Sequence, residues 1–105
     1  MNLASLPQTV VDALALETAV TALRLKDMLN AAGPSRAAAL NALAFVFVDM
    51  APHGQPAPET FTQALAFLAS DRVVIDDGVA QAALAFCNDG TNPPNAADVM
   101  AEETL

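Results

Sequence analysis

The chain has 105 residues, 54% of them hydrophobic, and a formal net charge of −8. This length favours a single domain over 1–105, and the apolar share argues against a disordered chain. Only four basic residues and no Tyr or Trp are present, so we expect no direct nucleic-acid binding, which needs clustered bases and stacking aromatics.

The composition also bears on the compartment. A single cysteine, Cys87, excludes an internal disulfide and fits a reducing compartment. The first ten residues lack the basic segment of a signal peptide, and no apolar run reaches the roughly 18–20 residues that cross a bilayer. We therefore expect a cytoplasmic protein, in the host cytoplasm if it is viral, with no membrane contact.

The first expected helix covers about 6–31. Ser5 and Gln8 have the spacing of a capping box, with Pro7 in the first turn, and Gly33 followed by Pro34 ends the helix. Apolar residues recur along it at helical spacing, in lines such as Leu6–Val10–Leu14 and Leu16–Val20–Leu23. A polar edge accompanies these lines and consists of Glu17, Thr18, Thr21 and Arg24.

The second expected helix, 36–50, is the most apolar part of the chain. Ser35 can cap it and Pro52 ends it. The alternative is a strand at 45–48, because aromatic and β-branched residues favour strands. We favour the helix, because residues 37–44 are rich in Ala and Leu and large apolar residues recur at helical spacing.

The remaining elements are shorter. Residues 51–58 contain three prolines and a glycine and predict a loop before a helix at 59–70. The segment 72–75 reads as an extended link or a short strand. Two further helices are expected at 78–88 and 96–103, where Asp and Asn residues can serve as N-caps.

The expected architecture is therefore all-α. It is a compact bundle of four main helices with a short C-terminal one, at about 6–31, 36–50, 59–70, 78–88 and 96–103. The alternative is an α+β fold with short strands at 45–48 and 72–75.

No motif predicts catalysis, a metal site or a cofactor. His53 is the only histidine and lies in the Pro-rich loop, and Cys87 lies inside an expected helix, where cysteine usually behaves as a small hydrophobe. The sequences Asp76-Asp77-Gly78 and Asn88-Asp89-Gly90 lack the alternating ligands of a calcium loop and are better explained as helix boundaries. We expect a protein that is not an enzyme and holds no cofactor or metal.

The helix at 36–50 carries more large apolar side chains than a small Ala-rich bundle can cover. We therefore expect a homo-oligomer, most simply a dimer, in which this helix forms the interface with help from the first helix. Asn41 and Asp49 interrupt the apolar surface and are either solvated or placed at that interface. The candidate interface residues are Leu40, Leu43, Phe45, Phe47 and Met50.

Charge is divided unevenly along the chain. Residues 1–52 hold three basic against four acidic residues, a net of −1, and residues 53–105 hold one against eight, a net of −7. The second half can therefore face water or a basic protein partner. The candidate acidic surface consists of Asp71, Asp76, Asp77 and Asp89.

These features predict a non-catalytic protein-interaction module acting through helical surfaces. Adaptors, assembly factors, virion or scaffold components and small acidic inhibitors belong to this class. The alternative is a binder of a small apolar ligand, with a pocket between the helices at 36–50, 59–70 and 78–88.

Overall fold

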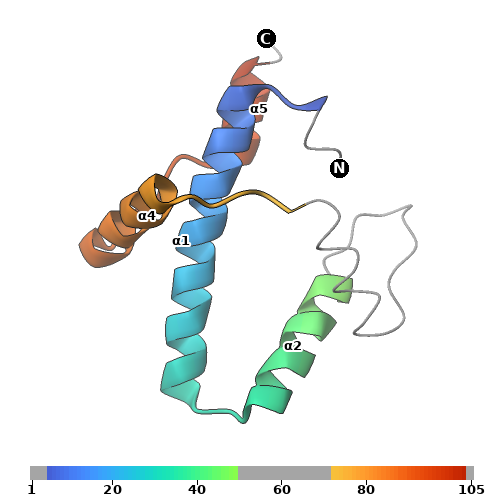
Figure 1. Cartoon of the computed structure of the whole chain (residues 1–105). Helices are drawn as coiled ribbons and strands as arrows, with labels where there is room; N and C mark the ends of the chain where they lie inside the picture. Colours follow the sequence, from blue (N-terminus) through green and yellow to red (C-terminus); the bar gives the residue numbers. More distant parts are fainter. Residues whose placement is uncertain (1–4, 50–71, 104–105) are drawn as a thin grey trace. The chain divides into compact units, whose positions relative to one another are not determined.

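The described residues of the computed structural model are 5–49 and 72–103 (Figure 1). They form α1 (Gln8–Ala32), α2 (Arg36–Asp49), α4 (Asp77–Asp89) and α5 (Ala96–Glu103), and these ranges contain no strand. The all-α prediction is therefore confirmed. The expected loop at 51–58 and helix at 59–70 lie outside the described residues.

The strand alternative is wrong at both of its positions. Residues 45–48 lie within α2, and 72–75 precede α4 without regular secondary structure. Four residues of strand preference do not outweigh a helix that Ala-rich residues have already begun, because adding a residue to an existing helix is far easier than starting one.

Helix α1 begins later than the capping-box pattern predicts. The carbonyl of Pro7 accepts the N–H groups of Val10 and Val11 at 3.0 and 3.1 Å, so the hydrogen-bond ladder opens at Pro7 and not at Ser5. Gln8 is the first helical residue, and its Nε2 donates to Asp12 Oδ1 at 2.8 Å along the helix. The expected role of Ser5 as N-cap is therefore wrong, and proline, which has no N–H to satisfy, starts the helix.

The junction between α1 and α2 follows the predicted chemistry. Gly33 has a left-handed backbone with φ of 68°, and its N–H donates to the Leu29 carbonyl at 3.0 Å. Only glycine adopts this conformation without strain from a Cβ atom. Ser35 Oγ then accepts the Ala38 N–H at 3.2 Å and caps α2.

Both ends of α4 are closed by local hydrogen bonds. Asp76 is the N-cap, and its Oδ1 accepts the Val79 N–H at 2.8 Å. At the other end Gly90 has φ of 70°, and the Thr91 N–H donates to the Phe86 carbonyl at 3.1 Å, as in a Schellman motif. The Asp-Asp-Gly and Asn-Asp-Gly sequences are thus accounted for by helix ends.

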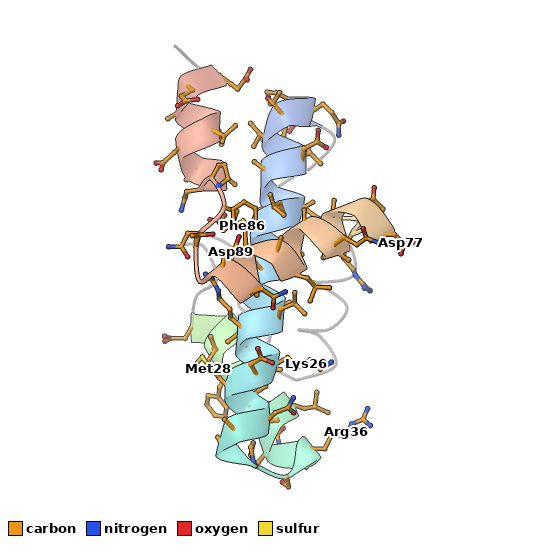
Figure 2. All side chains as sticks on the ribbon, turned by 90° about the vertical axis from the view of Figure 1, so that its left-hand side faces the viewer. Lys26, Met28, Arg36, Asp77, Phe86 and Asp89 are labelled. Atoms are coloured by element: carbon orange, nitrogen blue, oxygen red, sulfur yellow. The ribbon has the colours of Figure 1, made fainter. Side chains whose placement is uncertain are left out.

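The contacts divide the chain into two units, 1–28 with 73–105 and 29–72. In the first unit α4 crosses α1 (Figure 2), and α5 lies alongside the N-terminal part of α1 (Figure 1). The core at the crossing is built from Ala19, Val20 and Ala83. Half-buried side chains that pack around it are Leu16, Leu23, Val79, Phe86 and Cys87.

The crossing depends on small side chains, which gives a stability prediction. Ala83 is 0% exposed, and a larger residue there would push α4 away from α1. Ala83→Leu should lower the free energy of unfolding by about 1–3 kcal/mol. Ala82→Leu, on the exposed side of the same helix, is the matched control and should change it by less than about 0.5 kcal/mol. Urea denaturation followed by circular dichroism measures both, and equal effects would contradict the assigned crossing.

The N-cap of α4 gives a second stability prediction. Asp76→Ala leaves the Val79 N–H without its side-chain acceptor and should lower stability by about 1 kcal/mol. Asp76→Asn removes the same charge but keeps the acceptor oxygen, so it should stay close to wild type in the same denaturation experiment. A loss of equal size in both variants would show that charge, and not capping, is the cause.

Candidate functional site

Helix α2 exposes large apolar side chains. Leu40, Leu43 and Val46 are 39%, 40% and 53% exposed, and Phe45 is 79% exposed. Phe47 is half-buried, and Met50, the fifth candidate interface residue, lies outside the described residues. Four of the five candidates are therefore described, and three of these are exposed in the single chain.

These side chains occupy two sides of α2. Leu40, Leu43 and Phe47 follow helical spacing and share one face. Phe45 is five positions from Leu40, which at 3.6 residues per turn places it roughly 140° around the helix. The helix is thus apolar both on the Leu40 face and nearly opposite to it, so a single neighbouring surface cannot cover both.

The polar residues of α2 do not require a buried partner. Asn41 and Asp49 are both exposed in the single chain. Water can satisfy them, and the cost of an unsatisfied buried polar group does not arise.

The candidate acidic residues do not form one patch. Asp76 and Asp77 lie at the start of α4 and Asp89 is its last residue, and Figure 2 shows Asp77 and Asp89 at its two ends. Twelve residues of helix separate these two by about 18 Å. Asp76 is also engaged in capping, and Asp71 lies outside the described residues. Asp76, Asp77 and Asp89 are each exposed, but the structure does not concentrate them.

A pocket that the sequence did not predict lies between α1 and α5. It has a volume of about 340 Å³. Its wall is mostly apolar and is formed by Leu6, Val10, Leu14, Ala96, Ala97 and Met100, with Glu17 and Asn95 completing it. Thr9 Oγ1 donates to Glu103 Oε1 at 2.9 Å, three residues beyond Met100 on α5, which ties the two helices there.

At the opposite end of the pocket, Glu17 meets the N-terminus of α5. Its Oε1 accepts the Ala96 N–H at 3.3 Å, and Asn95 Oδ1 accepts the N–H groups of Ala97 and Asp98 at 2.9 and 3.4 Å. The first three amides of α5 are thus satisfied by two side chains. A carboxylate at this position is also favoured by the positive end of the helix dipole.

A second, more polar pocket adjoins the first through Glu17 and Asn95. Its volume is about 310 Å³, and Thr21 and Arg24 belong to its wall. Arg24 donates to Asn92 Oδ1 and to the Thr91 carbonyl, both at 2.6 Å. The guanidinium therefore fastens the α4–α5 connection to α1 and is not directed at the carboxylate of Glu17.

The described ranges hold no group of three or more His, Cys, Asp or Glu side chains placed to bind a metal ion. Cys87 is half-buried, packs against the core and directs its Sγ toward the Val20 carbonyl at 3.9 Å. His53 lies outside the described residues, as does much of the expected pocket between 36–50, 59–70 and 78–88. Within the described part, no helix is long and apolar enough to traverse a bilayer.

Comparison of the chain with protein-family models, with curated proteins and with solved structures finds no match.

The sequence does not predict the α1–α5 pocket, and the reason is physical. The sequence shows the line Leu6–Val10–Leu14 and the polar edge at Glu17, but it does not show which helix packs beside them. The bond from Ala96 to Glu17 joins residues 79 apart in the chain. The one available signal was Glu17 itself, an acid next to an apolar line without a basic residue three or four positions away.

Glu17 should therefore stabilise the docking of α5. Glu17→Ala removes the acceptor for the Ala96 N–H and should lower the free energy of unfolding by about 1–2 kcal/mol. Glu17→Gln keeps an acceptor oxygen and should lose less than half as much. Hydrogen exchange of the α5 amides, alongside thermal unfolding, measures the effect. Unchanged α5 protection in Glu17→Ala would contradict this role.

Proposed function

We propose that the protein is a non-catalytic interaction module that self-associates through α2. The observation that carries this proposal is the exposure of Phe45, at 79%, together with Leu40, Leu43 and Val46 on the same helix. Surface apolar residues are common singly, but four large ones exposed on one helix of 14 residues are typical of an interaction site.

A second copy is the partner that the charge favours. The half of the chain that contains α2 has a net charge of −1, whereas residues 53–105 carry −7. Two copies that meet through α2 therefore bring together helices that each hold one basic and one acidic residue, so the contact itself carries little repulsion. Repulsion between like charges weakens with distance and is screened over roughly 8–10 Å at physiological salt.

Burying these exposed side chains would favour association. Fully burying a large apolar side chain contributes about 1.5–3 kcal/mol, and association itself costs several kcal/mol. Because α2 is apolar on two sides, one copy can contact the Leu40 face while Phe45 contacts another surface. A dimer is the simplest assembly, and the second apolar side offers a route to a larger one.

In this proposal the exposed acids of α4 are available to a basic protein partner. Asp77 and Asp89 lie at opposite ends of α4, so a basic protein partner would contact them singly and not as a cluster. This arrangement favours an adaptor, assembly factor or scaffold component over an inhibitor that imitates the dense charge of a nucleic acid.

Sedimentation velocity over a range of concentrations tests the self-association. Wild type should shift from monomer to dimer or larger species as concentration rises, and Phe45→Asp and Leu43→Asp should each move this shift at least tenfold higher. The introduced aspartate disfavours an apolar interface, because burying an unpaired carboxylate is costly. A wild-type chain that stays monomeric at high micromolar concentration would overturn the proposal.

Leu84→Asp is the matched control. Leu84 is 50% exposed on α4, so the variant adds the same charge and removes a comparable exposed apolar group outside α2. Its association should resemble that of wild type. Because Phe45 is mostly exposed, Phe45→Asp should also retain the helical circular dichroism signal, which separates loss of assembly from loss of folding.

A further inference from the structure

The pocket between α1 and α5 combines an apolar wall with a carboxylate at one end. Val10 and Ala96 are buried at its inner side, and Met100 is exposed on α5. Glu17 is half-buried, and its Oε1 accepts one N–H, from Ala96. No basic side chain belongs to the wall of this pocket. An apolar ligand that enters it therefore meets a carboxylate that accepts one α5 amide and has no basic side chain in the same wall.

We propose that this pocket binds a small hydrophobic ammonium compound, with its alkyl chain along Val10 and Leu14 and its ammonium group at the Glu17 carboxylate. The pocket volume of about 340 Å³ falls at the lower end of the roughly 300–1,000 Å³ that small-ligand pockets occupy. This inference does not depend on self-association through α2.

The charge of the chain supports a cation over a neutral or anionic ligand. The net charge of −8 attracts cations over long range, and Glu17 acts at short range. The nearest base along α1 in the C-terminal direction, Arg24, is held by Asn92 and the Thr91 carbonyl and serves the neighbouring polar pocket. An anionic ligand of the same shape would meet Glu17 unfavourably.

The geometry favours a small molecule over a protein segment. Hydrogen bonds from Thr9 to Glu103 and from Ala96 to Glu17 join α1 to the last and first residues of α5. The two bonded positions of α1 are eight residues apart, a rise of about 12 Å, which leaves room for an alkyl chain. A helix with its side chains is about 10–12 Å wide and would occupy the whole of this span, which a pocket of about 340 Å³ does not offer.

A series of three ligands with one chain length tests the proposal. Hexylammonium, 1-hexanol and hexanoate are titrated into the ¹⁵N-labelled full chain, and amide shifts are followed by NMR. Hexylammonium should shift Val10, Leu14, Glu17 and Ala97 in a saturable way and bind about two- to fivefold more tightly than hexanol, as expected for one solvent-accessible charge pair. Hexanoate should bind most weakly.

Glu17→Gln isolates the short-range charge. It should bring hexylammonium and hexanol to equal affinity while leaving the hexanol affinity within about twofold, because the apolar contacts remain. Glu102→Gln changes the net charge by the same amount at an exposed residue outside the pocket wall, and it should keep the preference for hexylammonium.

A pocket-filling variant isolates the apolar contacts. Ala97 is exposed and belongs to the wall, so Ala97→Leu should weaken all three ligands, whereas Ala82→Leu on α4 should weaken none. Shifts that map outside this wall, no saturable response, or equal binding of hexylammonium and hexanoate would each overturn the proposal. So would a basic amphipathic peptide that shifts these amides when hexylammonium does not, because the pocket would then be a protein-docking surface.

Discussion

The described part of the first unit depends on the close contact between α1 and α4 at Ala19, Val20 and Ala83. Alanine at the crossing lets the two backbones approach, and larger side chains around it, such as Phe86 and Leu23, fill the space beside the contact. This crossing fixes the position of α4 against α1. The position of the C-terminal end of α4 in turn limits where the 91–95 segment and α5 can lie. The pocket between α1 and α5 follows from that sequence of constraints.

Helix α1 contacts three neighbouring segments, each through a different face. Its small residues meet α4, its line of Val10 and Leu14 faces α5, and its polar edge holds the connection between them. The polar edge is therefore structural, since Glu17 satisfies the first amide of α5 and Arg24 binds the 91–92 backbone and side chain. Polar residues along one edge of α1 thus determine how the 91–95 segment and α5 are attached to it.

Helix α2 shows the opposite situation. Its apolar side chains exceed what the described chain covers, and Phe45 is the clearest example. A buried core helix would show these side chains largely covered, as Val20 is on α1. The exposed apolar residues of α2 and the wall of the α1–α5 pocket have no residue in common, so the two proposals can succeed or fail independently.

The sequence by itself determined where most described helices begin and end. Ser35, Asp76 and Asn95 act on amides two or three residues away, and Gly33 and Gly90 act through their own φ angles, so these signals are local. The start of α1 was the exception, because Ser5 and Pro7 are both signals for a helix start and lie two residues apart. Tertiary structure alone decided that Glu17 meets Ala96 and Arg24 meets Asn92, since packing brings together residues 79 and 68 apart and local preference carries no information about such pairs.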